Sequence, residues 1–153
     1  MTPFPGQDSA TARRVRVRVG RRGTFLLVVG LGELVWGLQY LLDPMPNPRG
    51  LALLTDAAPL HAWAWLWIAA GAVAAVAACV RIGGDWTGFA ALLTPPTVWT
   101  AAYVAGAFSG SYGQGLWVAV YYATTHVGVC LWASAMPEYA VPAPDTAGKG
   151  ARG

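Results

Sequence analysis

The chain has 153 residues, of which 56% are hydrophobic and only 11% charged, and its formal net charge is +3. Soluble proteins carry about 25% charged residues, so this composition excludes an ordinary soluble domain and favours a protein that lies largely in lipid. Nine of the ten basic residues are arginine. Together with frequent alanine, glycine and valine, this bias is typical of GC-rich coding sequence and indicates a bacterium or one of its phages.

The first 23 residues combine a Pro/Gly-containing start with the basic run RRVRVRVGRR. We expect 1–23 to form a disordered, basic juxtamembrane arm, because arginine alternates with valine at period two and suits an extended chain better than an amphipathic helix. Arginines beside anionic lipid headgroups contribute about 1 kcal/mol each. Lipid headgroups are therefore the predicted partners, and no nucleic acid is expected. The arm's arginines are Arg13, Arg14, Arg16, Arg18, Arg21 and Arg22.

Four apolar segments follow, at 24–42, 60–80, 89–108 and 116–136. Each approaches the roughly 20 residues that a helix needs to cross a bilayer core of about 30 Å. Short, turn-rich separators make neighbouring helices antiparallel. Residues 24–136 therefore predict an all-α, polytopic bundle of four antiparallel transmembrane helices, followed by a disordered cytoplasmic tail over 137–153.

The basic residues predict the orientation of these helices. Nine of them fall before the first helix, after the second or after the fourth, and only Arg49 falls on the opposite side. Cytoplasmic loops of membrane proteins carry the excess of lysine and arginine. We therefore expect a multi-pass protein of the bacterial inner (plasma) membrane with both termini in the cytoplasm.

The first apolar segment contains a carboxylate, Glu33. A rise of 1.5 Å per residue places it about 14 Å into the membrane, and His126 in the fourth segment reaches about the same depth from the opposite face. An isolated ionised carboxylate in hydrocarbon costs several kcal/mol, so Glu33 should be protonated or paired. We expect an intramembrane polar pair, which either fixes the register of two helices or carries a proton or cation.

A face of small and polar residues surrounds this glutamate. Gly30, Glu33, Gly37 and Tyr40 share one face of the first helix, and Tyr122 shares a face of the fourth helix with His126. Small residues let helix backbones approach closely. We therefore predict a supporting seam between the first and fourth helices.

The third segment contains adjacent prolines, Pro95 and Pro96. They remove two amide donors, which frees the carbonyls of Ala91 and Leu92 and predicts a helix kink. The hydroxyls of Thr94 or Thr97 could compensate the freed carbonyls.

Signatures of catalysis and metal binding are missing from the sequence. There is no nucleophile elbow, phosphate-binding loop, zinc-binding HExxH or carboxylate pair. Cys79 and Cys130 have no ligand-like spacing and are expected to be buried free thiols. We expect no enzyme activity, no cofactor and no metal site.

Two resemblances suggest functions. The stretch LGELVWGL, residues 31–38, resembles the small multidrug resistance transporters, which implies that Glu33 binds a cationic substrate in exchange for protons. The stretch RGTFLLVVGL, residues 22–31, resembles small membrane proteins of GC-rich bacteria and their phages, including holin-like proteins. We expect a non-enzymatic component that packs or self-associates through its helices, holin-like or accessory, as a homo-oligomer. The alternative is a small proton-coupled transporter that uses Glu33.

Overall fold

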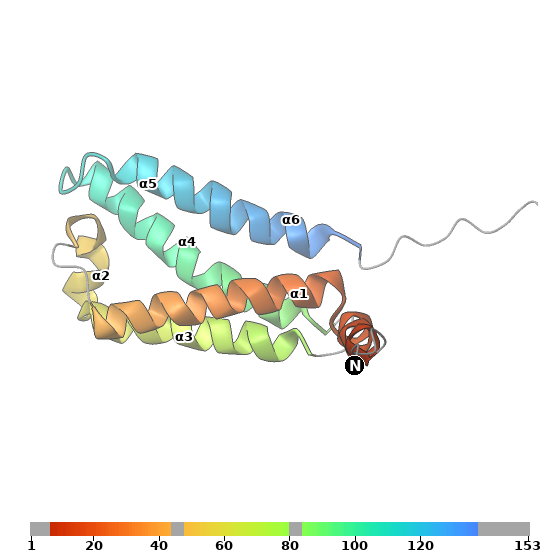
Figure 1. Ribbon diagram of the computed structural model, residues 1–153. Coiled ribbons are helices and arrows are strands. Elements are labelled where there is room, and N and C mark those ends of the chain that lie inside the picture. Colours follow the sequence, from red (N-terminus) through yellow and green to blue (C-terminus); the bar gives the residue numbers. More distant parts are fainter. Residues whose placement is uncertain (1–6, 44–47, 80–83, 138–153) are drawn as a thin grey trace, which may run out of the picture.

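The computed structural model describes residues 7–43, 48–79 and 84–137, which form helices joined by turns (Figure 1). The predicted all-α class is confirmed for this part of the chain. The tail from 138 onward and residues 1–6 lie outside the described residues. The elements are α1 (Gln7–Leu42), η1 (Arg49–Leu51), α2 (Ala52–Ala57), α3 (Leu60–Ala77), α4 (Trp86–Phe108), α5 (Gly115–Tyr122), η2 (Ala123–Gly128) and α6 (Val129–Ala135).

Helix α1 begins at Gln7, well before the predicted start at 24. Its helical dihedrals are interrupted at Gly20, where φ is 59° and ψ is −175°, a conformation that glycine adopts without steric cost. Residues 7–19 are thus helical, whereas the alternation of arginine and valine favoured an extended chain. The reason is that arginine is a good helix former, while the alternation with valine is a weaker signal when no neighbouring strand is present.

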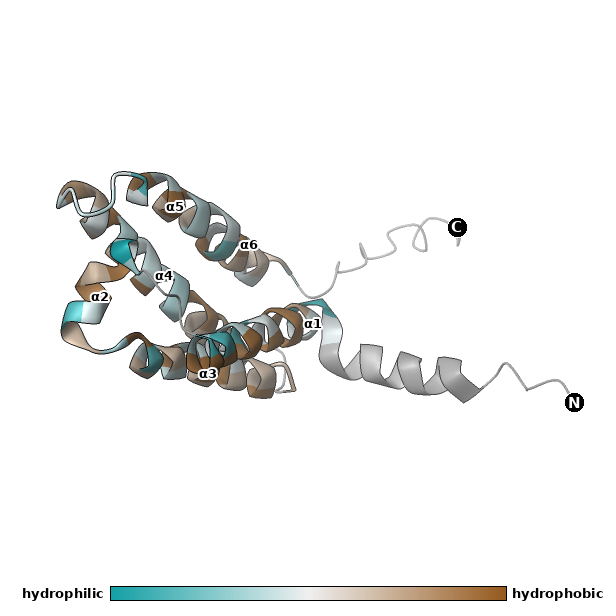
Figure 2. Cartoon of the chain, turned by 60° about the vertical axis from the view of Figure 1, so that its left-hand side comes forward, coloured by the Kyte–Doolittle hydropathy of each residue, from teal (hydrophilic) through white to brown (hydrophobic). Residues whose placement is uncertain are grey.

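Three helical stretches in the described part of the chain are long and apolar enough to cross a membrane: Gly20–Leu42, Leu60–Ala77 and Gly115–Ala135. Figure 2 colours them by hydropathy. Helix α4 has 23 residues and is long enough, but its threonines and two prolines make it less apolar than these three. The structure therefore supports three candidate spans in the described part of the chain.

Glycines bring α1 and α3 into close contact (Figure 1). A Cβ atom added to Gly30 would lie 2.9 Å from the carbonyl oxygen of Gly71, and one added to Gly37 would lie 2.9 Å from that of Ala64. The predicted seam therefore has a different partner, because these glycines face α3 and not the helix over 116–136. Close contact between helices needs small residues on both sides, and α3 supplies them.

The core consists of two clusters at different heights along the helices. One surrounds Tyr40, Trp67 and Trp99, and the other surrounds Leu26 and Leu92. The buried indole Nε1 of Trp99 donates a 3.2 Å hydrogen bond to the hydroxyl of Tyr40. Tyr40 is thus joined to α4, whereas the seam prediction placed it against the helix over 116–136.

Helix α4 continues through its two prolines, whose side chains are fully buried. The hydroxyl groups of Thr94, Thr97 and Thr100 each donate to the carbonyl four residues earlier, at distances of 2.6–2.9 Å. The acceptors are the carbonyls of Ala90, Leu93 and Pro96, so none of these three hydroxyls bonds to the freed carbonyls of Ala91 and Leu92.

Arg22 joins α1 to the start of α4 and to the end of α6. We call the end of the molecule that contains Arg22 and Asp85 the basic end. Arg22 Nε lies 2.6 Å from Asp85 Oδ2 at the start of α4. Arg22 Nη1 donates to the carbonyl oxygens of Ser134 and Met136 at the end of α6. Helix α2 lies at the opposite end (Figure 1). The spacing of residues in the sequence gave no indication of this ion pair, because Arg22 and Asp85 belong to distant parts of the chain.

Candidate functional site

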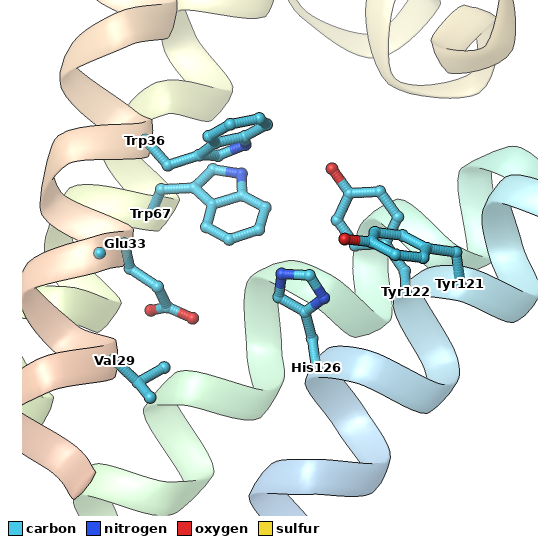
Figure 3. Close-up of a pocket in the computed structure, with 8 residues that line it drawn as sticks. Val29, Glu33, Trp36, Trp67, Tyr121, Tyr122 and His126 are labelled. Atoms are coloured by element: carbon cyan, nitrogen blue, oxygen red, sulfur yellow. The ribbon is translucent and has the colours of Figure 1, made fainter.

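A cavity of about 310 Å³ lies between α1, α3, α5 and η2 (Figure 3). It lies between the two core clusters, and Glu33 of α1 forms part of its wall. Its lining residues are Val29, Gly32, Glu33, Trp36, Trp67, Tyr121, Tyr122 and His126. The structure therefore brings Glu33, His126 and Tyr122 together, as the sequence predicted, although their helices are joined by few other contacts.

Glu33 directs its carboxylate into this cavity, on the side where His126 lies (Figure 3). The residue is only 5% exposed, and its Oε2 atom is buried without a hydrogen-bond partner in the described part of the chain. A buried polar atom without a partner costs about 1–3 kcal/mol, more when it is charged. A carboxylate in this position is therefore more stable when it is protonated or paired with a cation.

His126 lies across the cavity from Glu33, and no hydrogen bond joins the two among the described residues. Its Nδ1 is 2.8 Å from the Thr125 hydroxyl, and its ring stacks on that of Tyr122 with centroids 5.0 Å apart. The predicted polar pair thus shares a cavity without direct contact. Partners within α5 and η2 hold the imidazole in place.

A π-helical segment, η2, carries His126 into the cavity wall. The π-helix accommodates an extra residue in the turn and often occurs at functional sites. The hydroxyls of Thr124 and Thr125 donate to the carbonyls of Val120 and Tyr121, which lie in the turn where η2 begins. Apolar periodicity gave no sign of this segment. The adjacent threonines were the only local signal for it.

Aromatic rings form most of the remaining wall. Trp36 and Trp67 lie with ring centroids 6.5 Å apart, and Tyr121 and Tyr122 face them from the other side (Figure 3). The indole Nε1 of Trp67 is also buried, and no described residue forms a hydrogen bond with it. Trp36, Trp67 and Tyr121 were not predicted as site residues. Helical spacing could have indicated Trp36, because it follows Glu33 by three residues and so shares its face.

The cavity opens sideways between α1 and α5. Gly32, Trp36 and Tyr121 are exposed at its rim, and Trp36 is 41% exposed. The outer faces beside the rim carry exposed apolar side chains such as Val35 and Trp117. A ligand that reaches this opening from the surrounding medium therefore meets an apolar surface first.

The other predicted site residues lie elsewhere. Gly30 and Gly37 pack on α3, Tyr40 bonds to Trp99, and the two prolines of α4 are in the core. The side chains of Arg13, Arg14, Arg16 and Arg18 lie outside the described residues, and Arg21 and Arg22 line a second cavity at the basic end. No group of three or more His, Cys, Asp or Glu side chains suited to a metal ion occurs in the part described.

Comparison with family models, curated proteins and solved structures gave no match for this chain. The resemblances drawn from residues 31–38 and 22–31 therefore stay predictions.

Proposed function

We propose that this protein is a multi-pass helical membrane protein that binds a small lipophilic cation in the Glu33 cavity and exchanges it for a proton. The observation that carries the proposal is the buried Glu33 Oε2, which has no hydrogen-bond partner among the described residues and lies at a cavity walled by aromatic rings. The transporter alternative drawn from the sequence is thus the better supported of the two functions.

The chemistry of the cavity favours a cation over a neutral ligand. A carboxylate is stabilised by positive charge, and the faces of tryptophan and tyrosine attract cations by about 0.5–2 kcal/mol each. Both effects are strengthened where water is excluded. A proton and a cation satisfy the same carboxylate, so each weakens the binding of the other, and this competition couples their movement.

The size and opening of the cavity restrict the ligand further. A volume of about 310 Å³ lies at the lower end of known ligand pockets, so a small organic cation fits better than a drug-sized one. The apolar rim favours a ligand with an apolar body. The unpartnered indole N–H of Trp67 adds a donor for a ligand that also carries an acceptor.

The proposed placement in the membrane has α1, α3, α4 and the α5–α6 stretch crossing as a four-helix antiparallel bundle. Contacts of α4 with α1, α3 and α5 support its inclusion, because a helix covered by other helices needs less hydropathy than one facing lipid. The excess of basic residues at one end supports cytoplasmic termini in a bacterial inner membrane. Self-association in the manner of a holin stays a prediction, because the exposed apolar faces suit lipid equally well.

A matched pair of ligands tests the binding of a cation. Benzyltrimethylammonium and neopentylbenzene have nearly the same shape, but only the first carries a charge. We expect the purified protein in detergent to bind the ammonium at least about tenfold more tightly, with a change in the fluorescence of Trp36 and Trp67. Glu33→Gln should reduce this preference to the part that the aromatic rings contribute, because the amide carries no charge.

The dependence on pH and a control variant complete this test. Binding of the ammonium should tighten as the pH rises, because loss of the proton from Glu33 frees the carboxylate, and the dependence should vanish in Glu33→Gln. Gln39→Ala, on an exposed part of α1 outside the cavity, should behave as the wild type. In proteoliposomes, an inward ammonium gradient should move protons outward. Equal binding of the two ligands would contradict the proposal.

A further inference from the structure

The indole N–H group of Trp67 is a second polar group in the wall of the Glu33 cavity. Trp67 lies on α3 and is only 2% exposed, and its Nε1 atom forms no hydrogen bond with any described residue. Buried indole N–H groups usually have an acceptor, because a buried donor without one is unfavourable. In Figure 3 this Nε1 atom is turned toward the side of the cavity where Tyr122 lies. An occupant of the cavity can therefore accept a hydrogen bond from it.

The neighbouring tryptophans of the same core cluster have acceptors within the protein. Trp63 Nε1 donates to the carbonyl oxygen of Leu54 at 2.9 Å, and Trp99 Nε1 donates to the hydroxyl of Tyr40 at 3.2 Å. Trp67 belongs to this cluster and is the one of these three that lines the cavity. The fold thus supplies acceptors to the two indoles away from the cavity and leaves the indole at the cavity for another group.

Close contacts between α1 and α3 fix the positions of Glu33 and Trp67. Glu33 lies between Gly30 and Gly37 in the sequence, and Trp67 lies between the two residues of α3 whose carbonyl oxygens these glycines approach. The backbones are therefore already in contact on both sides of the two residues. The indole N–H donates to neither carboxylate oxygen, although the two groups are chemically complementary. Donor and carboxylate are thus held in place for a ligand that uses both, which lowers the entropic cost of binding.

We infer that the cation bound in the Glu33 cavity carries a hydrogen-bond acceptor on its apolar body, and that Trp67 selects for this acceptor. The inference rests on the cation binding proposed for Glu33. The ligand class is an organic ammonium ion with a carbonyl or ether oxygen. Such an oxygen needs only a donor, whereas a hydroxyl group brings a proton that needs a further partner. An ammonium ion of the same shape without the oxygen leaves the Trp67 N–H unsatisfied and therefore binds more weakly.

A pair of ammonium ions that differ in one group tests the role of Trp67. Phenacyltrimethylammonium and phenethyltrimethylammonium have the same skeleton and charge, but the first has a carbonyl where the second has a methylene. By calorimetry in detergent, we expect the wild type to bind the phenacyl compound about fivefold more tightly, as one hydrogen bond provides. Trp67→Phe should remove this preference, because phenylalanine has no N–H. Trp36→Phe replaces another indole of the same cavity and should keep the preference, so it is the matched control.

The outcomes separate this inference from the proposal for Glu33. Equal binding of the two ammonium ions by the wild type overturns the inference, and so does a preference that Trp67→Phe retains. If Trp67→Phe does not fold, benzothienylalanine at position 67 gives the same test, because it keeps the shape of the indole and has sulfur in place of the N–H. A wild type that prefers benzyltrimethylammonium over neopentylbenzene but ignores the carbonyl would leave cation binding at Glu33 in place and remove the role of Trp67.

Discussion

Glu33 shows how one residue can be predicted correctly while its contacts are not. Its depth and its position opposite His126 followed from helical rise alone. Whether the two groups bond depends on shifts of a few ångströms between helices, and residue spacing does not encode those shifts. In the structure the carboxylate faces a cavity and no hydrogen bond to His126 forms in the part described. This geometry is the reason why we propose a ligand role for Glu33.

The free energy of unfolding of a Glu33→Leu variant tests the ligand role proposed for Glu33. Since the buried Oε2 atom has no hydrogen-bond partner in the part of the chain that the structure describes, its removal should raise the free energy of unfolding by about 1 kcal/mol. The same variant should lose binding of the ammonium ligand, as expected where a functional group is kept at a cost in stability. Unfolding by sodium dodecyl sulfate, followed by circular dichroism, measures the change. A clear loss of stability would show that Glu33 is bonded within the bundle.

Tyr40→Phe, on the same helix, removes a buried polar group that has a hydrogen-bond partner, in contrast to Glu33→Leu. The Tyr40 hydroxyl accepts a hydrogen bond from Trp99, and its removal leaves the buried indole N–H without that partner. We expect a loss of about 1–2 kcal/mol in the free energy of unfolding, in the same detergent titration. An unchanged stability would mean that this hydrogen bond does not contribute to the core.

At the level of elements, helical periodicity predicted most of the helices but not their partners. The predicted stretches 60–80 and 89–108 correspond to α3 and α4 within a few residues, and 116–136 corresponds to α5, η2 and α6 together. The stretch 24–42 ends where α1 ends, but α1 begins at Gln7. The glycine face of α1 could serve any neighbour with small residues, and both α3 and α5–α6 have them. Contact with α3 follows from details of both surfaces, including Gly71 and Ala64, that a single helix does not reveal.

Alanine substitutions test the contact between α1 and α3. A Cβ atom at Gly30 would lie 2.9 Å from the Gly71 carbonyl oxygen and 3.1 Å from the Ala74 Cβ, so the helices must separate to accept it. We expect Gly30→Ala to lower the free energy of unfolding by about 1–3 kcal/mol. Gly32→Ala is the matched control, because a Cβ atom there meets nothing within 4 Å. Equal effects of the two variants would contradict this packing.

At the scale of the whole molecule, composition and charge predicted more than local patterns did. The apolar content and the turn-rich separators led to an all-helical chain with spans long enough for a membrane. The extended conformation that the alternation of arginine and valine favoured is a helix in the structure, because periodicity alone is a weak guide where no neighbouring strand fixes the conformation. The cavity itself could not be predicted, because its walls come from three distant stretches of the sequence and its histidine depends on a π-helical turn.

The orientation proposed for the whole molecule can be tested with its own cysteines. Cys79 was expected to be buried, but α3 ends at Ala77 and leaves Cys79 exposed, whereas Cys130 is only 3% exposed. If the basic end faces the cytoplasm, a charged, membrane-impermeant maleimide should label the wild type only after the cells are permeabilised.

A cysteine at the opposite end supplies the complementary measurement. Gly113 is exposed in the turn before α5, and a Cβ atom there meets nothing within 4 Å. In a Cys79→Ala background, Gly113→Cys should therefore fold normally and be labelled in intact cells. Cys130 stays shielded by its neighbours and provides the unlabelled baseline. Labelling of Cys79 in intact cells, with protection of Gly113→Cys, would reverse the orientation and place the arginine-rich arm on the outer face. Because the Glu33 cavity lies between the two ends, its binding of a cation would survive that reversal, but the direction of exchange would not.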